Sequence, residues 1–207
     1  MNKVGESRTC NPVSKERSYH HGNVRAAIMA AALDALERTE PTALSLRELA
    51  RTVGVGHSAL YGHFRDRTAI LAAIAGEGFR ALLSDLRAVP VNEDRHLTRL
   101  ATTYLHFART RPAYYRSMFL PEVSLPENFN QIEEACHACF ETLVTALDVA
   151  PTDETREKAT AIWSALHGLA MLGSDSGPLH NRIPQNREMA LASKIVEGLA
   201  KASWIGA

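Results

Sequence analysis

Two short helices joined by a tight turn are predicted between Ser45 and Phe64, in the run SLRELARTVGVGHSALYGHF. Ser45 can accept a hydrogen bond from the backbone N–H of Glu48 while the Glu48 side chain reaches back, a capping box that fixes the start of the first helix. Apolar residues then recur at three- and four-residue spacing, at Leu46, Leu49, Ala50 and Val53. Gly54 follows where the chain must leave that helix, because a residue without a Cβ is least strained there.

The second helix of the pair is predicted from about Gly56 to His63 and offers Leu60 and Phe64 to the core. Small Ala50, turn Gly54 and apolar Leu60 have the spacing that lets two helices cross closely around a short turn. The pattern predicts a helix-turn-helix, although a helical hairpin with a purely structural role would need the same three residues.

Hydrogen-bond donors crowd the remaining faces of this stretch and of the residues that follow it. They are Arg47, Arg51, His57, Ser58, Tyr61, His63, Arg65 and Arg67. Such side chains suit phosphates and base edges, so the composition favours a DNA-binding role in which the second helix enters the major groove.

Composition limits the other classes of protein. The formal net charge is zero, but residues 1–80 hold 11 Lys and Arg against 8 Asp and Glu, so the positive excess lies with the helix-turn-helix. Three cysteines, Cys10, Cys136 and Cys139, cannot build a disulfide framework, and the N-terminus does not resemble a signal peptide. No apolar run approaches the length of a membrane span. We therefore expect a cytoplasmic protein without a membrane helix.

Helical periodicity continues along the whole chain, and no run has the period of a strand. We expect an all-α fold with a flexible arm at 1–19, a three-helix DNA-binding domain at 20–67, a connecting helix at 68–87 and a helical bundle at 88–207 for regulation and dimerisation. Asn23 or Gly22 should cap the first helix, and Asp66 should cap the connecting helix. The arm could touch phosphates through its basic residues or remain a solvated tail.

Within the bundle, a short aromatic helix AYYRSMF should be followed by an irregular loop between Pro121 and Pro126. One continuous amphipathic helix is predicted from about Glu127 to Leu147. Further helices should cover Thr152 to Leu172 and Asn186 to Trp204.

The segments YHHGNVRAAIMAAALDALE and ALSLRELARTVGVGHSALYGHFRDRTAIL resemble the N-terminal domain of the TetR family of transcriptional regulators. The capping box, Gly54, Tyr61, Phe64 and Arg67 stand at the spacing of that family. The run WSALHGLA, from Trp163 to Ala170, resembles the signature of a TetR subgroup with a Trp-His-Gly motif.

The resemblance implies that Tyr61 and His63 approach the sugar-phosphate backbone and that Arg67 docks a phosphate. His57 and Ser58, at the leading end of the recognition helix, are the candidates for base edges. The full predicted DNA-binding set is Ser45, Arg47, Gly56, His57, Ser58, Tyr61, His63 and Arg67. Glycine at 56 and 62 departs from residues common in the family and removes side chains that could reach DNA, and Tyr61 could have a packing role instead.

Family members bind near-palindromic operators as homodimers through two helices from each copy, so the last two helices are the candidates here. Small and apolar residues that would allow a close approach are Ala165, Gly168, Ala192, Ile195, Leu199 and Ala200. A monomer in which these faces bury one another is the alternative.

An effector pocket is expected inside the C-terminal bundle. The candidate ligand-binding residues are Tyr104, Phe107, Tyr114, Tyr115, Met118, Phe119, Phe140, Trp163 and His167. His167 combines an apolar setting with a donor and an acceptor, but a structural histidine that bonds a neighbouring helix is the competing interpretation.

Cys136-His137-Ala138-Cys139 has the outline of a metal motif, yet both cysteines fall on an apolar helix stripe and no second pair exists, so packing is favoured over metal binding or a redox role. No GxSxG, HExxH, P-loop or dinucleotide fingerprint is present, and we expect neither catalysis nor a cofactor. The prediction is a repressor whose small-molecule effector tilts the connecting helix. A helical adaptor or sensor that has lost DNA binding is the first alternative, and a small helical enzyme is the second.

Overall fold

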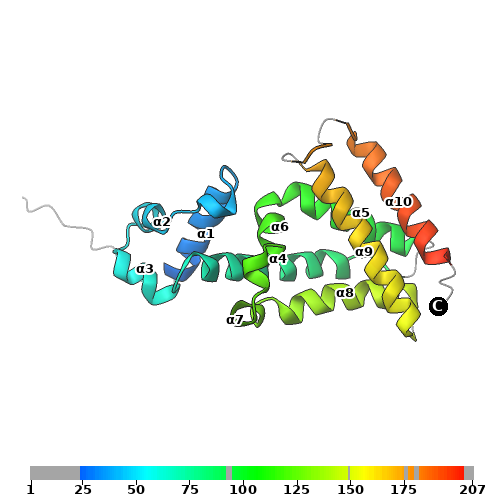
Figure 1. The fold of residues 1–207 in the computed structure, drawn as a ribbon, viewed down its shortest axis with the longest axis horizontal. Helices are drawn as coiled ribbons and strands as arrows, with labels where there is room; N and C mark the ends of the chain where they lie inside the picture. Colours follow the sequence, from blue (N-terminus) through cyan, green and yellow to red (C-terminus); the bar gives the residue numbers. More distant parts are fainter. Residues whose placement is uncertain (1–23, 92–94, 149, 175–176, 180–181, 203–207) are drawn as a thin grey trace, which may run out of the picture.

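The computed structural model describes residues 24–91, 95–148, 150–174, 177–179 and 182–202, and every regular element within these ranges is helical (Figure 1). The predicted arm at 1–19 and the predicted helix cap at 22–23 lie outside the described residues. The N-terminal elements are α1 (Val24–Leu36), the 3₁₀ turn η1 (Pro41–Ala43), α2 (Leu46–Val53), α3 (His57–His63) and α4 (Arg67–Arg87). The C-terminal elements are α5 (His96–Thr110), α6 (Pro112–Met118), the 3₁₀ turn η2 (Pro121–Ser124), α7 (Pro126–Phe129), α8 (Glu133–Leu147), α9 (Asp153–Gly173) and α10 (Gln185–Lys201).

The turn between α2 and α3 has the geometry that the sequence predicts. Ser45 caps α2, its Oγ accepting a hydrogen bond from the Glu48 N–H at 3.4 Å, although the Glu48 side chain makes no return bond among the described residues. Gly54 is left-handed, with φ 74° and ψ 32°. The Val55 N–H donates to the Ala50 carbonyl at 3.0 Å and the Gly54 N–H donates to the Arg51 carbonyl at 3.2 Å, which is a Schellman motif.

A small core fixes α3 against α1 and α2. Leu60 and Phe64 are buried there with Ile28, Leu36 and Leu49. The Arg25 guanidinium lies over the Phe64 ring at 4.2 Å and donates to the His63 carbonyl at 3.2 Å, which satisfies a carbonyl at the end of α3.

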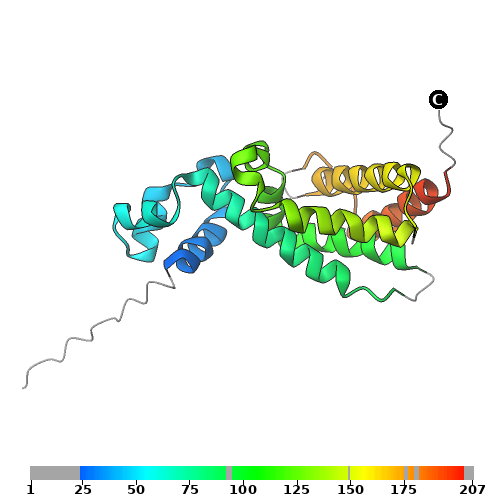
Figure 2. The same ribbon diagram turned by 90° about the horizontal axis from the view of Figure 1, so that it is seen from below.

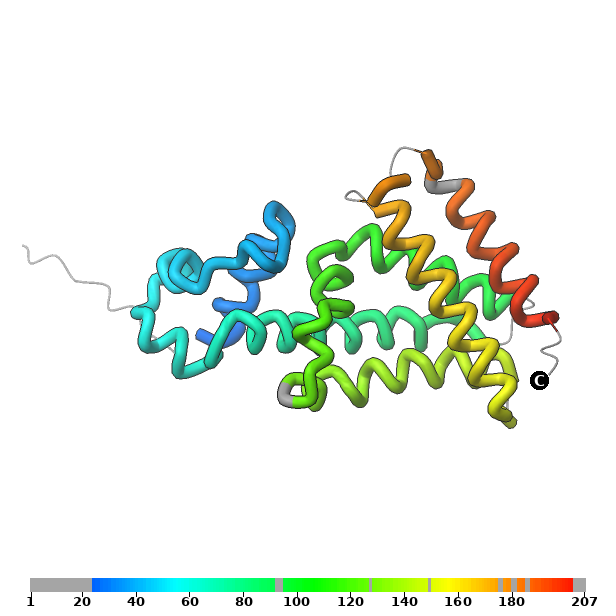
Figure 3. Tube along the Cα trace, viewed as in Figure 1, coloured from blue at the N-terminus to red at the C-terminus, as the bar shows by residue number. Residues whose placement is uncertain are grey.

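The long helix α4 joins the two halves of the molecule (Figures 1 and 3). Asp66 caps it by accepting from the Ala69 N–H at 2.7 Å, as predicted. At about 1.5 Å per residue the helix is roughly 30 Å long. Its first turns bury Ile70 and Ile74 near α1, and its last turns bury Leu82 and Leu86 within the C-terminal bundle.

Helices α4 and α8 pack along one another (Figure 2). Gly76 of α4 permits a close approach, since a Cβ there would lie 2.5 Å from the Gln131 carbonyl oxygen. The predicted continuous helix from 127 to 147 is wrong at this point, because the chain breaks between α7 and α8 where Gln131 passes over α4. The predicted loop after α6 is also wrong. Pro121 and Pro126 each stand at the first position of a short helical turn, where the missing N–H of proline costs nothing.

The bundle is completed by α5, α9 and α10, which pack on one another. A capping box between Thr152 and Thr155 starts α9, with backbone-to-side-chain bonds of 3.3 and 3.1 Å. The predicted last helix ends at Lys201 within the described residues, and Trp204 lies outside them. None of the described helices is long and apolar enough to cross a membrane.

Candidate nucleic-acid interface and inner cavity

The outer face of α3 carries the polar side chains that were predicted to meet DNA. His57 and Ser58 are exposed in its first turn, and Tyr61 is 44% exposed one turn later, while Leu60 on the opposite face is fully buried. The His57 and Tyr61 rings touch edge to face, with centroids 4.8 Å apart. This contact orients the imidazole and leaves both polar tips outside.

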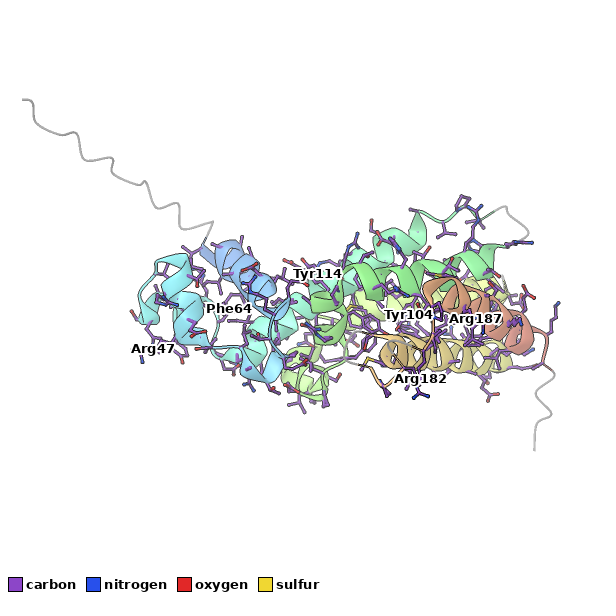
Figure 4. All side chains as sticks on the ribbon, turned by 90° about the horizontal axis from the view of Figure 1, so that it is seen from above. Arg47, Phe64, Tyr104, Tyr114, Arg182 and Arg187 are labelled. Carbon is purple, nitrogen blue, oxygen red and sulfur yellow. The ribbon has the colours of Figure 1, made fainter. Side chains whose placement is uncertain are left out.

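Helix α2 contributes a second row of donors next to α3. Arg47 and Arg51 are exposed, and Figure 4 shows Arg47 at the outer end of the N-terminal helices, away from the bundle. Ser45, Arg47, Arg51 and His57 line one open hollow between the two helices. The structure therefore gathers residues from both helices on one surface, including Arg51, which the predicted site omitted.

Gly56 and Gly62 are both exposed. Each therefore stands at a surface position where a longer side chain could have reached DNA. A Cβ at Gly62 would meet nothing within 4 Å, so no internal packing explains the glycine there. Ala59, also exposed on α3, was absent from the predicted set. Its methyl group is of the kind that contacts thymine, but an alanine gives no signal in the sequence.

Two predicted phosphate ligands have internal roles in the structure. The Arg67 guanidinium is half-buried and donates through Nη1 to the Thr42 carbonyl at 2.6 Å, so it braces the start of α4 against η1. The phosphate contact predicted for Arg67 would therefore use the rest of the guanidinium, since Nη1 already has an internal partner. His63 is half-buried, and its backbone carbonyl holds Arg25.

An apolar cavity of about 30 Å³ lies between α4, α5, α8 and α9. Of the predicted ligand-binding residues, Tyr104 and Trp163 line it. The other lining residues are Leu82, Leu86, Leu100, Ala101, Cys139, Thr142, Leu143 and Leu166. Leu82 and Leu86 belong to α4, so the helix that directly follows the helix-turn-helix also forms a wall of the cavity.

Three polar side chains form a hydrogen-bonded trio beside this cavity. The Tyr115 hydroxyl lies 2.8 Å from His167 Nδ1, and the Tyr104 hydroxyl lies 3.0 Å from the Tyr115 hydroxyl and 3.3 Å from the same Nδ1. Burial lowers the pKa of His167, and burial raises the pKa of Tyr104 to about 12 against the opposing effects of its bonds to Tyr115 and Trp163. The trio is therefore neutral near pH 7, with a lone pair of Nδ1 accepting a tyrosine proton.

The remaining aromatic predictions divide into three groups. Phe119 packs on His167 with centroids 4.3 Å apart, and Phe140 stacks on Trp163 at 5.6 Å, so both support the cavity from behind. Phe107 and Met118 are fully buried and do not line the cavity. Tyr114 is half-buried and donates to Glu77 at 3.4 Å, and Figure 4 shows it apart from Tyr104. Its assignment to the pocket is wrong.

Cys139 is buried in the cavity wall, with its thiol 3.5 Å from the Phe79 carbonyl. Burial raises the pKa of Cys139 to about 12 and also raises that of Cys136, so neither thiol is a ready nucleophile or metal ligand. In the part of the chain that the structure describes, no group of three or more His, Cys, Asp or Glu side chains is arranged to hold a metal.

The outer faces of α9 and α10 expose apolar and small residues. Met171, Leu172 and Leu191 are 45%, 42% and 41% exposed, and a Cβ at Gly168 would meet nothing within 4 Å. Ala165, Ile195, Leu199 and Ala200 are half-buried on the same two helices. Ala192 is fully buried in the single chain, so its predicted contact with a partner is wrong, and Leu191 is the outward neighbour.

Two arginines connect the bundle to the helix-turn-helix. Arg116 of α6 donates to the Leu36 carbonyl at the end of α1. Arg65, in the turn before α4, donates to the buried Asn128 side chain of α7 at 3.2 Å, and Asn128 in turn donates to the Glu122 carbonyl at 3.0 Å. These contacts complement the covalent connection through α4.

Both the N-terminal helices and the C-terminal bundle match known protein families. The family described as bacterial regulatory proteins, tetR family, matches residues 28–74, and the tetracyclin repressor-like C-terminal domain matches residues 97–197. The chain belongs to the TetR family. It is a DNA-binding transcriptional regulator and not an enzyme.

Solved structures agree with this assignment. A protein of unknown function from Rhodococcus sp. RHA1 is 33% identical, with 90% of this chain and 100% of that chain covered and a TM-score of 0.72. A regulatory protein of the tetR family from Rhodococcus RHA1 is 23% identical over 84% of this chain and 96% of its own, with a TM-score of 0.64. A tetR-family transcriptional regulator from Streptomyces coelicolor is 19% identical over 86% and 79%, with a TM-score of 0.68. The last two likenesses show the TetR fold alone, and no curated protein sequence matches the chain.

Proposed function

We propose that this TetR-family regulator is a ligand-responsive repressor that binds a near-palindromic operator as a homodimer. One observation carries the proposal: α4 is a single helix whose first residue braces the helix-turn-helix and whose last turns line the inner cavity. A ligand in the cavity therefore acts directly on the element that positions α3.

For DNA recognition, we assign base reading to the first turn of α3 and phosphate contacts to the residues around it. His57 and Ser58 are exposed and present donors and acceptors, with Ala59 available for a thymine methyl group. Arg47 and Tyr61 would contact the backbone and set the register. Arg67 acts mainly by holding α4 against η1.

For dimerisation, we assign the stripe formed by the exposed residues Met171, Leu172 and Leu191 together with the half-buried Gly168 and Ile195. Apolar side chains exposed side by side on two packed helices are typical of a surface that a partner covers. A second copy of the same stripe would make an isologous interface, and the two α3 helices would then face successive major grooves.

Regulation follows from unequal affinity. A ligand that binds one separation of the recognition helices more tightly shifts the population toward it, and a ligand that binds both equally shifts nothing. If the favoured separation does not fit the operator, the ligand releases the DNA.

The DNA-binding part is tested by selecting sites from random duplexes with the full chain and measuring affinity by mobility shift at several salt concentrations. His57→Ala should relax the preference at one base position in each half-site, whereas Arg47→Ala should weaken all sites evenly and reduce the salt slope by about 1.8, since each subunit loses one phosphate contact. His106→Ala, at an exposed position on α5, is the matched control and should change neither. A chain that enriches no sequence would contradict the proposal and fit the adaptor interpretation.

The dimer is tested by sedimentation equilibrium. The wild-type chain should sediment as twice its 22.7 kDa mass, and Leu191→Glu should sediment as a monomer with an unchanged helical circular-dichroism spectrum. A folded Leu191→Glu variant that remains dimeric would place the interface elsewhere.

A further inference from the structure

The inner cavity has the surface of a site for an uncharged ligand. Its described lining residues are aliphatic, aromatic, thiol or hydroxyl side chains, and none of them is charged. Leu82, Leu100 and Leu166 are almost fully buried, so the walls also exclude water. A charged group entering such a site would lose its hydration without gaining a partner.

The hydroxyl and thiol groups in the wall are already engaged. The Thr142 hydroxyl donates to the Ala138 carbonyl at 2.8 Å, and the Cys139 thiol donates to the Phe79 carbonyl at 3.5 Å. Tyr104 differs in having several exchangeable partners, because its hydroxyl belongs to the trio with Tyr115 and His167 and also interacts with Trp163, so a ligand hydroxyl can replace one of them. One ligand hydroxyl could therefore be satisfied there.

The wall toward α8 and α9 is the side that can open. Thr142, Leu143 and Trp163 are half-buried, whereas the lining residues of α4 and α5 are buried. The cavity of about 30 Å³ has room for one or two water molecules, so a ligand must widen it by moving this wall. Small molecules need the smallest movement.

We infer that the effector is a small, uncharged and mainly apolar molecule with a single hydroxyl group, held in this cavity with its hydroxyl against Tyr104. The inference rests on the proposed ligand-responsive function and adds the chemical class of the ligand. Carboxylates and amines are excluded in their ionised forms.

Three probes of nearly equal size test the charge requirement: benzyl alcohol, benzoate and benzylamine. The sequence has two tryptophans, so Trp204→Phe leaves Trp163 in the cavity wall as the fluorescence reporter. Each probe is titrated at pH 7.5 into this full-length variant up to about 20 mM, the weak limit for a ligand of this size. Benzyl alcohol should change the Trp163 emission. Benzylamine should bind on the order of 10²-fold and benzoate on the order of 10³-fold more weakly, because roughly one molecule in 10² of benzylamine and one in 10³ of benzoate is neutral at that pH.

Two pairs of variants place the ligand. Tyr104→Phe should weaken benzyl alcohol about 2-fold to 10-fold by removing one hydrogen bond, while Tyr114→Phe, whose hydroxyl faces Glu77, should not. Ala101→Leu should fill the cavity and abolish binding, while Ala30→Leu on the exposed face of α1 should not. A thermal melt of each variant confirms that it is folded, and the Tyr104 pair serves if Ala101→Leu does not fold.

The inference is overturned if either charged probe binds as tightly as benzyl alcohol, if no probe changes the Trp163 emission, or if Tyr104→Phe and Tyr114→Phe bind benzyl alcohol equally. These outcomes are separate from the site selection that tests DNA binding. A chain that selects an operator but prefers benzoate would keep the proposed function and refute the ligand class.

Discussion

Alanine should destabilise the protein at Gly54 and stabilise it at Gly62, although both glycines are exposed in the helix-turn-helix. Neither position limits the side chain by packing, because a Cβ at either residue would meet nothing within 4 Å. The backbone decides the sign. Gly54 has a φ of 74°, where an alanine costs about 1–2 kcal/mol. Gly62 lies in the last turn of α3, where an alanine gains about 0.5–1 kcal/mol.

The two variants should therefore differ by roughly 1.5–3 kcal/mol in the free energy of unfolding, measured by urea denaturation with circular dichroism. Gly54→Asn should lose less than Gly54→Ala, since asparagine visits the left-handed region more readily. In the mobility-shift assay, Gly62→Ala should leave operator affinity unchanged or improve it. If Gly54→Ala and Gly62→Ala shift stability in the same direction, the assignment of the turn to a backbone requirement is wrong.

Three other substitutions test long-range contacts. His167→Asn should flatten the pH dependence of stability. Because burial lowers the pKa of His167 from 6.5, the wild-type protein loses stability as the pH falls below about 6.5. Urea denaturation of both proteins from pH 7.5 to 5 measures the difference. Arg109→Met should cost about 2–4 kcal/mol by leaving the buried Glu188 carboxylate unpaired, and Glu188→Gln in the same chain should restore part of it. Arg116→Met should cost about 1–3 kcal/mol by removing the donor to the Leu36 carbonyl, and it should weaken ligand-induced DNA release in a mobility shift.

Local sequence signals account for the parts of the fold that were predicted well. The Ser45 cap, the left-handed Gly54 and the burial of Leu60 depend on residues within a few positions of one another, and so does the Asp66 cap of α4. Such short-range patterns are set by helix geometry and side-chain chemistry, which a single sequence displays. The exposed recognition face of α3 follows from the same periodicity.

Contacts between distant segments account for the errors. The amphipathic pattern from 127 to 147 continues through residues 130–132, but the helix breaks there because Gln131 passes over Gly76 and Asn128 is drawn inward by Arg65 and Glu122. The internal role of Arg67 was also missed, because its partner, the Thr42 carbonyl, lies 25 residues away. A backbone carbonyl leaves no mark on the sequence.

Tyr114 and Tyr115 show the same limit inside the bundle. Consecutive residues of a helix point about 100° apart, so Tyr114 and Tyr115 face different surroundings. Composition cannot say which, because both are tyrosines that follow the proline at the start of α6. The packing of α6 on α4 and α5 turns Tyr115 toward His167 and leaves Tyr114 beside Glu77.

The orientation of α6 also explains how the cavity and the DNA-binding helices are mechanically related. Tyr115 bonds to the trio beside the cavity, and the next residue, Arg116, bonds to the Leu36 carbonyl at the end of α1. In the proposed ligand response, a ligand hydroxyl that draws Tyr104 away from Tyr115 would act on the short helix α6 and, through Arg116, on the end of α1. Because α4 forms a second connection between the same two regions, the N-terminal helices are held at two points, and we expect a shift of one point relative to the other to rotate α3.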